Sequence, residues 1–425
     1  MTSGRHESRL DDEAGKVYKG GADHRFTDAK GQDRGGKKID LGPTVVLDQE
    51  RCILCDRCVR FMRDVAGDEQ LYLAGRGDRA YITTFPGKEL THDYDLNVTD
   101  ICPVGALTGK HFRFQQRVWM LKKVESIAPD DSLGANLTIE YNNGKVWRLM
   151  PRRNPAVNKA WIANGTRLLY QTLDQNRLID GRVAGQPVAI GAALAAAGKA
   201  LAGAKRVAIV ASGHLTTEDN AAALAFAESL GAKAEVFGGS WLAAGKADGI
   251  ARSGDPVANR KGMQLLGIAD NLDALAARAG EFDTLLVLGH DLYGANAAKA
   301  AALTAIPTRI VLASWNDATV AHSTIAVGVR CWAEVRGSMV NCHGRVQLLN
   351  ACPVVAAAEI EPVWQVLTRL ATFAGKPIPW LSEVDAWKSA VARVPQFSGM
   401  SYRSIGPMGA LIVETPAATP VAAGA

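Results

Sequence analysis

The stretch that decides the fold of the N-terminal part is Arg51-Cys52-Ile53-Leu54-Cys55-Asp56-Arg57-Cys58, which Cys102-Pro103 follows farther along the chain. A thiol at every third residue turns three sulfurs toward one centre, and a fourth cysteine that precedes a proline can complete the set. This ligand pattern is typical of a [4Fe–4S] cluster in ferredoxin-type proteins. We therefore expect one cluster, with ligands Cys52, Cys55, Cys58 and Cys102.

The cysteine run itself predicts one cluster rather than two. The usual bacterial run has a further cysteine four residues after the third, and that residue serves a second cluster. Met62 occupies this position here. A zinc site and a set of buried thiols without metal stay open as alternatives. Zinc sites commonly pair two Cys-x2-Cys knuckles, so the three-plus-one spacing favours the iron–sulfur cluster.

Length and composition predict a multidomain protein. The chain has 425 residues, which is long for one core, so we expect two or three domains. A net charge of +5 is mild and gives no indication of a nucleic-acid partner. The longest apolar stretch, residues 188–211, carries three basic side chains and is too polar to span a membrane. No apolar signal core opens the chain.

Five segments follow from the local patterns. Residues 1–43 are polar and charged with both signs, which predicts an extended strap or a disordered segment. We expect a ferredoxin-like iron–sulfur domain over residues 44–125, a segment with a β-hairpin over 126–184, an α/β domain over 185–414 and a disordered tail over 415–425. The remaining cysteines, Cys331, Cys342 and Cys352, lack Cys-x2-Cys spacing, which fits a reducing compartment.

Local signals place elements in the first three segments. A helix is expected over about residues 59–66, ended by Gly67, with short strands over 71–73 and 81–84. Asn143-Gly144 lies between two alternating runs within residues 137–150, which predicts a β-hairpin. Phe61, Tyr72 and Trp119 are expected to be core residues that exclude water from the cluster. Whether Arg57, Arg60 and Lys110 offset the charge of the cluster or line a solvated face stays open.

The pattern beyond residue 185 is that of an α/β domain with a parallel sheet covered on both faces. A helix over Glu218–Leu230 is opened by Thr216 with Asp219 three residues later and is closed by Gly231. Strands are expected over residues 207–211, 234–237, 284–288, 310–313 and 325–329.

The α/β part contains no recognisable catalytic motif. There is no G-x-G-x-x-G that opens a helix, no P-loop, no HExxH and no G-x-S-x-G. His214, His290 and His343 are scattered, so we interpret them as loop or capping residues. The basic and aromatic run of residues 111–119 is interpreted as a packed linker between domains rather than a nucleic-acid stacking surface.

The cysteine segments resemble the large iron–sulfur subunit of bacterial NADH–quinone oxidoreductase, which is respiratory complex I. The resemblance rests on residues 47–61 and on residues 100–108, which read Asp100-Ile101-Cys102-Pro103-Val104-Gly105-Ala106-Leu107-Thr108. Residues 150–158, 332–341 and 344–347 are similar to the part of that protein related to molybdopterin oxidoreductases. The resemblance runs from about residue 7 to beyond residue 400.

The resemblance implies a function and a setting. The cluster on Cys52, Cys55, Cys58 and Cys102 would lie in the relay between flavin and quinone, and the α/β domain would be a degenerate molybdopterin-oxidoreductase-like domain without molybdopterin. The partners would be the other hydrophilic subunits of complex I. The location would be the cytoplasm, peripheral on the cytoplasmic face of the inner membrane.

The chain departs from the family pattern in two places. Some members carry a further cluster on a Cys-x2-Cys-x3-Cys run plus one more cysteine, but this chain has Ala128, Asp131, Ala135 and Ala163 at those positions. The family's [2Fe–2S] domain and its His/Cys-ligated cluster are missing, and Ser8 stands where one ligand cysteine would be. The resemblance therefore implies an N-terminally truncated member.

Three functions compete on these residues. The first is an electron-transfer subunit with one [4Fe–4S] cluster. The second is a structural subunit of the same assembly whose cluster lies off the main electron path. The third, an active molybdopterin oxidoreductase, is disfavoured because its usual proximal cluster has no ligands here.

Overall fold

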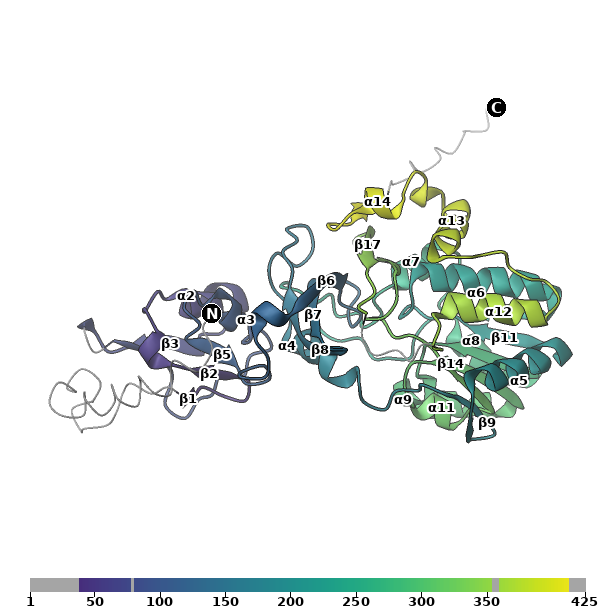
Figure 1. Ribbon diagram of the computed structural model, residues 1–425, viewed down its shortest axis with the longest axis horizontal. Coiled ribbons are helices and arrows are strands. Elements are labelled where there is room, and N and C mark those ends of the chain that lie inside the picture. Colours follow the sequence, from purple (N-terminus) through teal and green to yellow (C-terminus); the bar gives the residue numbers. More distant parts are fainter. Residues whose placement is uncertain (1–37, 78–79, 354–358, 413–425) are drawn as a thin grey trace, which may run out of the picture. The chain divides into compact units, whose positions relative to one another are not determined.

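The computed structural model describes residues 38–77, 80–353 and 359–412, which fall into two compact units (Figure 1). The first unit comprises Met1–Lys123 and Ile139–Tyr170, and the second comprises Val124–Thr138 and Gln171–Ala425. Most of the expected strap, including Ser8, and all of the expected tail lie outside the described residues. The finer division into five segments stays a prediction.

The first unit is built from small antiparallel sheets and short helices. Three strands form a sheet in the order β1-β2-β5, and β3 pairs with β4 in a separate hairpin. The two strands predicted over residues 71–73 and 81–84 are confirmed as β3 and β4. The bounds of these strands are β1 Ile39–Asp40, β2 Val45–Leu47, β3 Leu71–Ala74, β4 Tyr81–Thr84 and β5 Leu107–Gly109.

The helix predicted after the cysteines is confirmed, but it has two parts. It begins as α2 (Arg57–Arg60) and widens into a π-helical turn, η3 (Phe61–Ala66), which ends at Gly67 with a φ of 71°. π-helical turns are rare and frequently lie at functional sites. The other short helices of this unit are η2 Gln49–Arg51, α3 Asn97–Ile101, η5 Val118–Met120 and α4 Asn164–Leu168.

The predicted Asn-Gly hairpin is confirmed. Strands β7 (Asn136–Asn142) and β8 (Lys145–Pro151) belong to a sheet in the order β6-β7-β8, in which β6 is Lys122–Ile127. Asn143 and Gly144 have φ values of 49° and 71°. Two consecutive left-handed residues are the requirement of a type I′ turn, which explains why Asn-Gly stands at this point of the sequence.

The core of the second unit is a seven-stranded sheet in the order β10-β9-β15-β14-β13-β11-β12. Neighbours from β15 to β12 pair in parallel, and β9 pairs antiparallel with both β15 and β10. All five predicted strands are present, which confirms the α/β class. Their bounds, with those of the edge strands, are β9 Gly181–Val183, β10 Gln186–Val188, β11 Val207–Val210, β12 Ala234–Phe237, β13 Thr284–Leu288, β14 Thr308–Ala313 and β15 Ile325–Gly328.

Helices cover both faces of this sheet (Figure 1). On β11, Val207 and Ile209 belong to one buried apolar cluster, whereas Ala208 and Val210 belong to another. Burial on both faces is why these strands read as continuous apolar runs rather than as alternating ones. The helices of this unit are α5 Ile190–Gly203, α6 Thr217–Leu230, α7 Arg260–Leu265, α8 Leu272–Ala277, α9 Leu292–Ala295, α10 Ala297–Ala300, α11 Ala318–Ala321, α12 Val363–Phe373, α13 Glu383–Arg393 and α14 Tyr402–Ile405.

Helix α6 begins and ends as its sequence predicts. The side chains of Thr216 and Asp219 form a reciprocal capping box, and Gly231 ends the helix with a φ of 70°. A smaller sheet in the order β16-β17-β18 contacts this part of the unit, with bounds β16 Gly337–Val340, β17 Arg345–Leu349 and β18 Ala410–Leu411. One short 3-10 helix, η6 Leu169–Thr172, crosses the border of the two units, and four more complete the second, namely η7 Gly231–Lys233, η8 Ala279–Glu281, η9 Ala301–Ala305 and η10 Pro395–Phe397.

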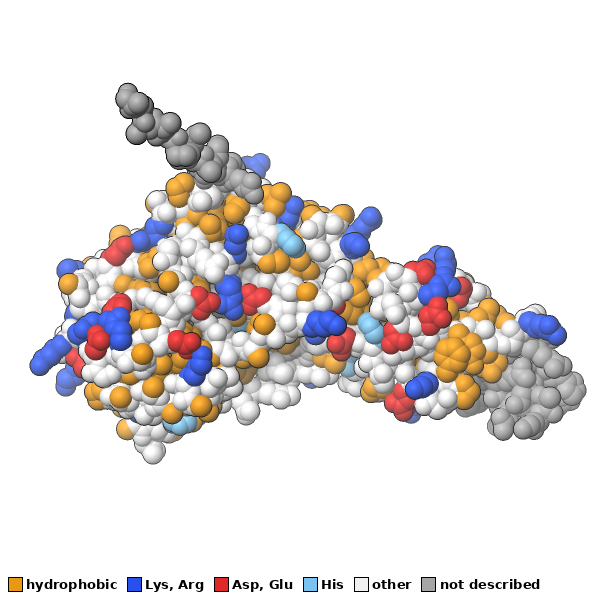
Figure 2. Space-filling view, turned by 180° about the vertical axis from the view of Figure 1, so that it is seen from behind, with side chains coloured by type: hydrophobic (Ala, Val, Ile, Leu, Met, Phe, Trp, Pro, Cys, Tyr) orange, Lys and Arg blue, Asp and Glu red, His pale blue; other side chains and the backbone are white. Residues whose placement is uncertain are grey.

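Among the described residues, no helix is both long and apolar enough to cross a membrane. Basic and acidic side chains are interspersed over the face of the surface in Figure 2. This mixture agrees with the small net charge of +5.

Glu218 is a fully buried carboxyl group in the first turn of α6. Its Oε2 accepts a hydrogen bond from the Ser338 backbone nitrogen at 2.7 Å, and its Oε1 accepts from the Ser338 hydroxyl at 2.9 Å and the Tyr402 hydroxyl at 2.8 Å. Burial raises the pKa of Glu218 from 4.5 to about 7, although these hydrogen bonds act in the opposite direction.

The first prediction concerns the pH dependence of stability. Because the folded pKa lies above the unfolded one, the native state holds the proton more tightly, and stability is lost as pH rises from 4.5 to about 7. The loss is on the order of 3 kcal/mol. Glu218→Gln keeps an acceptor for Ser338 and cannot ionise, so we expect its urea unfolding curves to lose this pH-dependent component. Equal pH dependence in the two proteins would contradict the assignment.

Candidate iron–sulfur site

The cysteine run forms a tight loop between η2 and α2. Asp48 caps η2 by accepting a hydrogen bond from the Glu50 backbone nitrogen at 3.2 Å, and Cys52 follows directly. Leu54 and Asp56 have φ values of 54° and 61°, in the left-handed region that side chains other than glycine rarely adopt. Two such residues in three positions turn the backbone sharply, which lets cysteines three residues apart face the same side.

The four predicted ligands are brought together by the fold. Cys52, Cys55, Cys58 and Cys102 line one small hollow, together with the apolar side chains of Ile53, Ile82 and Val104 and with Asp56 and Arg57. Cys58 is buried, and the other three are partly buried. Four sulfur donors around one apolar hollow fit the donor chemistry of an iron–sulfur cluster. The sequence prediction that these four residues meet is therefore reproduced in the structure.

Burial and the neighbouring cysteines raise the pKa of two of these thiols, Cys52 and Cys58. Burial raises the pKa of Cys52, and the neighbouring Cys102 and Cys55 add to the effect. Burial raises the pKa of Cys58 to about 12, again reinforced by the other cysteines. Iron binds the thiolate, so cluster assembly at these residues has to release protons.

The choice between an iron–sulfur cluster and a zinc ion at these residues stays a prediction. A tetrahedral zinc site needs four sulfurs about 2.3 Å from one ion, so the sulfurs must converge closely. In the part of the chain that the structure describes, no group of three or more His, Cys, Asp or Glu side chains converges tightly enough to hold a single metal ion.

The predicted surroundings of the cysteines are only partly correct. Phe61 is buried and packs on Trp161 with ring centroids 4.7 Å apart, as expected of a core residue. Tyr72 is half-buried and stacks on Phe85 at 4.3 Å. The prediction for Trp119 was wrong, because this side chain is 57% exposed.

The three basic residues considered near the cluster differ in their contacts. Arg57 lines the hollow of the cysteines. Arg60 donates to the Cys55 carbonyl at 3.4 Å and lies 3.9 Å from the Asp56 carboxylate. The ammonium group of Lys110 pairs with Asp40 at 2.7 Å, so its charge is largely neutralised there.

Sequence reasoning missed the residue that holds Cys102 in place. Cys102 follows α3, and its backbone nitrogen donates to the Val98 carbonyl at 3.2 Å. Within α3, Asp100 binds the guanidinium group of Arg167 through both carboxylate oxygens. Arg167 is only 1% exposed and comes from α4, far along the sequence. No local signal marks this pair, because its partners are 67 residues apart.

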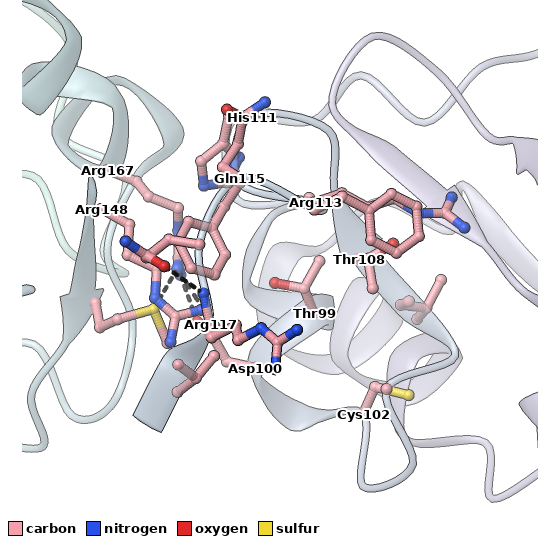
Figure 3. Close-up of a pocket in the computed structure, with 18 of the residues that line it drawn as sticks. Thr99, Asp100, Cys102, Thr108, His111, Arg113, Gln115, Arg117, Arg148 and Arg167 are labelled. Carbon is pink, nitrogen blue, oxygen red and sulfur yellow. Dashed lines mark hydrogen bonds and ion pairs between the residues drawn. The ribbon is translucent and has the colours of Figure 1, made fainter. Parts of the chain in front are cut away.

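The basic and aromatic run after β5 surrounds a second, larger hollow in the same unit. It has a volume of about 810 Å³, and its walls include Cys102, Arg148 and Arg167 (Figure 3). His111 lies in this wall, and burial lowers its pKa to about 4, with a further contribution from Arg167 and Arg148. The interpretation of the run as a packed linker was wrong for Phe114 and Trp119, which are 77% and 57% exposed.

The positions of the family's second cluster now have other contacts. Ala128, Ala135 and Ala163 are buried, and Ala163 belongs to the first unit whereas the other positions belong to the second. The Asp131 carboxylate accepts hydrogen bonds from the backbone nitrogens of Leu133 at 2.8 Å, Ser253 at 2.9 Å and Gly254 at 3.1 Å. Asp131 therefore anchors a loop of the second unit.

Two of the scattered histidines lie side by side in the α/β unit. His214 follows β11 and His290 follows β13, with ring centroids 5.3 Å apart. Burial lowers the pKa of His214 to about 4 and that of His290 to about 3, so both rings are neutral at pH 7. They lie in loops, as predicted, but their pairing depends on strand order and was not visible in the sequence. His343 lies in the turn between β16 and β17.

The fold and the site of the first unit define a class of protein. Small antiparallel sheets, a short helix directly after the cysteine run and four thiols around one hollow characterise a ferredoxin-like iron–sulfur domain. A family model of the ferredoxin-like domain of NADH-quinone oxidoreductase subunit 3 matches residues 42–108. The 4Fe-4S domain of NADH-ubiquinone oxidoreductase NDSU1/NuoG-like proteins matches residues 121–171.

Individual relatives point to the same family. The mitochondrial NADH dehydrogenase (ubiquinone) iron-sulfur protein 1 of Solanum tuberosum is 44% identical over 161 residues, which cover 38% of this chain and 21% of that protein. The NADH-ubiquinone oxidoreductase 75 kDa subunit of Reclinomonas americana is 41% identical over 145 residues, which cover 34% and 21%. This part of the chain is thus similar to the large iron–sulfur subunit of complex I, and the match spans about a fifth of these relatives' length.

Structural comparison adds little for the α/β unit. Acetylene hydratase from Pelobacter acetylenicus aligns with a TM-score of 0.28 at 13% identity, over 38% of this chain and 22% of that one. This score is too low to define a relative. The α/β class is confirmed by the sheet itself, and the molybdopterin-oxidoreductase-like origin of this unit stays a prediction.

The second prediction tests the anchor of Cys102. Arg167→Met removes the partner of Asp100 and leaves a partly buried carboxylate inside the iron–sulfur unit, which should cost roughly 2–4 kcal/mol. We expect a lower unfolding temperature and faster loss of iron to a chelator. Arg182→Met, a half-buried arginine of β9 in the second unit, is the control. Unchanged iron retention in Arg167→Met would show that α3 holds Cys102 without this ion pair.

Proposed function

We propose that this chain is an electron-transfer subunit of complex I or of a complex-I-like assembly and carries one [4Fe–4S] cluster. The observation that carries the proposal is the convergence of Cys52, Cys55, Cys58 and Cys102 on one hollow, within the segment that matches the family. A cluster bound there would supply one-electron exchange at a potential set by burial and by hydrogen bonds to sulfur.

The chain's own residues would tune such a cluster by excluding water and by placing charge. Ile82 and Val104 are apolar walls of the hollow, and Phe61 with Trp161 forms a packed aromatic pair beyond it. Arg57 adds a positive charge at the wall, which would stabilise the more negative, reduced state of a cluster. Ile53 is 61% exposed, so the cysteine loop also has a side open to solvent.

The count of one cluster rests on the second matched segment. Residues 121–171 contain no cysteine, although the family model for that segment describes a 4Fe-4S domain. Asp131, at one of the ligand positions, instead accepts several backbone hydrogen bonds. We infer that this segment has kept its fold and lost its cluster, and that the α/β unit works without molybdopterin.

The proposed setting follows from the relatives. Their names place them in NADH–ubiquinone oxidoreductase, so we propose that the neighbours of this chain are other hydrophilic subunits of such an assembly. The chain would belong to a peripheral arm on the cytoplasmic face of the inner membrane.

The third prediction tests the cluster and its ligands. The reconstituted chain should contain about four iron atoms and give a single [4Fe–4S] signal by electron paramagnetic resonance (EPR) after reduction. Cys55→Ser should lose most of the iron and the visible charge-transfer absorption, because a serine oxygen is a poor cluster ligand. Cys342→Ser, a partly exposed cysteine of the second unit, is the matched control and should keep both.

Two results would contradict the proposal. A full four-iron spectrum in Cys55→Ser would remove this residue from the ligand set, and a second iron–sulfur signal from the unmodified chain would refute the count of one. A cluster that is not reoxidised by quinone in the intact assembly would show that it lies off the electron path.

A further inference from the structure

Residues 113–120, which follow β5, expose several apolar side chains on the surface of the iron–sulfur unit. Phe114 is 77% exposed and Trp119 is 57% exposed, and beside Trp119 the side chains of Val118 and Met120 are 41% and 51% exposed. Isolated exposed apolar residues are normal, but four within seven positions form a patch. Aromatic residues, methionine and arginine are the types enriched at the centres of protein interfaces.

The backbone holds this patch in an outward-facing shape. Phe114 has a φ of 59°, a left-handed conformation that costs a side-chain-bearing residue about 1 kcal/mol or more. The preceding turn is closed by hydrogen bonds from the backbone nitrogens of Phe112 and Arg113 to the Gly109 carbonyl at 3.1 Å and 2.9 Å. Val118–Met120 form the short helix η5. The aromatic side chains are therefore displayed by an ordered loop.

The charge of the patch is positive. The guanidinium groups of Arg113 and Arg117 lie 4.8 Å and 5.3 Å from the ring centroids of Phe114 and Trp119. Within the described ranges, no acidic side chain forms an ion pair with Arg117. The hollow behind the patch is lined by five arginines and only two aspartates, namely Arg51, Arg113, Arg117, Arg148, Arg167, Asp48 and Asp100.

Arginine side chains also form the buried wall of the hollow. Arg167 is 1% exposed, and its Nε has no hydrogen-bond partner within the described part of the chain. The pKa of the half-buried His111 is lowered to about 4 by burial and by Arg167 and Arg148, so this ring stays neutral at pH 7. Arg51, Arg148 and Arg167 already pair with Asp48, Glu140 and Asp100. An acidic group that enters the hollow would therefore find its ion-pair partner in Arg117 at the rim.

The position of the hollow suggests which kind of partner is useful there. Cys102 belongs to its wall as well as to the hollow of the other three cysteines. Figure 3 shows Cys102 on one side of this space, with Arg148 and Arg167 on the other. A partner seated here would lie beside Cys102, the fourth cysteine of the proposed cluster site.

We propose that residues 113–120 and the adjoining hollow form the docking surface for an acidic segment of a neighbouring polypeptide that carries its own redox centre. The part of this inference that gives the partner a redox centre rests on the function proposed above. Val118 and Met120 offer neither a stacking face nor a charge to a nucleic-acid strand, whereas apolar side chains of this kind are buried at the centres of protein interfaces, so a protein partner fits better.

The fourth prediction tests the occupant by photo-crosslinking. The full chain is produced in its host with p-benzoylphenylalanine in place of Trp119, and with the same residue in place of Leu73 as the control. Leu73 is 44% exposed on β3 of the same unit and lies outside the hollow. We expect an adduct at position 119, but not at position 73, to an acidic peptide of a cofactor-bearing protein. Adducts only to this chain, only to nucleic acid, or none at all would overturn the proposal.

A charge reversal tests the electrostatic part with the partner that the crosslink identifies. Arg117→Glu should weaken its binding about tenfold or more at low salt, and the difference should shrink at high salt because the interaction is screened. Arg76→Glu makes the same change of net charge at an exposed arginine outside the hollow and should bind like the wild type. Equal weakening in both variants would overturn the role of Arg117.

Iron content and the EPR signal separate this proposal from the function on which it rests. A wild-type chain without a redox-active cluster would refute the proposed function, whatever crosslinks form. An intact cluster in Arg117→Glu, together with unchanged binding, would refute only the docking surface.

Discussion

The convergence of four thiols on one centre is the constraint on which the iron–sulfur unit depends. Three of them come from a single loop whose backbone takes left-handed conformations at Leu54 and Asp56. The fourth comes from the end of α3, which the buried Arg167 holds through Asp100. Burial raises the pKa of the Cys58 thiol to about 12, so an iron centre bound there would have to displace its proton.

The two units of the chain are stabilised in different ways. The iron–sulfur unit has short strands and short helices and relies on polar anchors such as Asn97, whose side-chain nitrogen donates to the carbonyls of Tyr94 and Ile162 at 2.9 Å each. The α/β unit has a mainly parallel sheet with an apolar cluster on each face, so burial of apolar surface is its main source of stability. In the second unit, hydrogen bonds from the backbone nitrogens of Ser253 and Gly254 to the Asp131 carboxylate hold the loop at this position.

The two hollows that Cys102 lines differ in size and in charge. Arg57 and the apolar residues Ile82 and Val104 enclose the thiols, whereas the hollow on the other side of Cys102 is wide and rich in arginine. The electron-transfer role that we propose would need both properties, because a redox centre must be shielded from water and still be approached closely by its partners. The exposed Trp119 and Phe114 are understandable in this light, since burial in the core would remove them from any partner.

The sequence by itself determined the features that depend on local spacing. The cysteine run, the Asn143-Gly144 turn, the Thr216 cap and five strands of the main sheet were all predictable, because each follows from the period of the chain or from the conformation that one residue favours. Only the tertiary structure decided which distant groups meet. The Arg167–Asp100 pair, the side-by-side His214 and His290, and the exposure of Trp119 depend on how separate elements pack, and no short stretch of sequence encodes that packing.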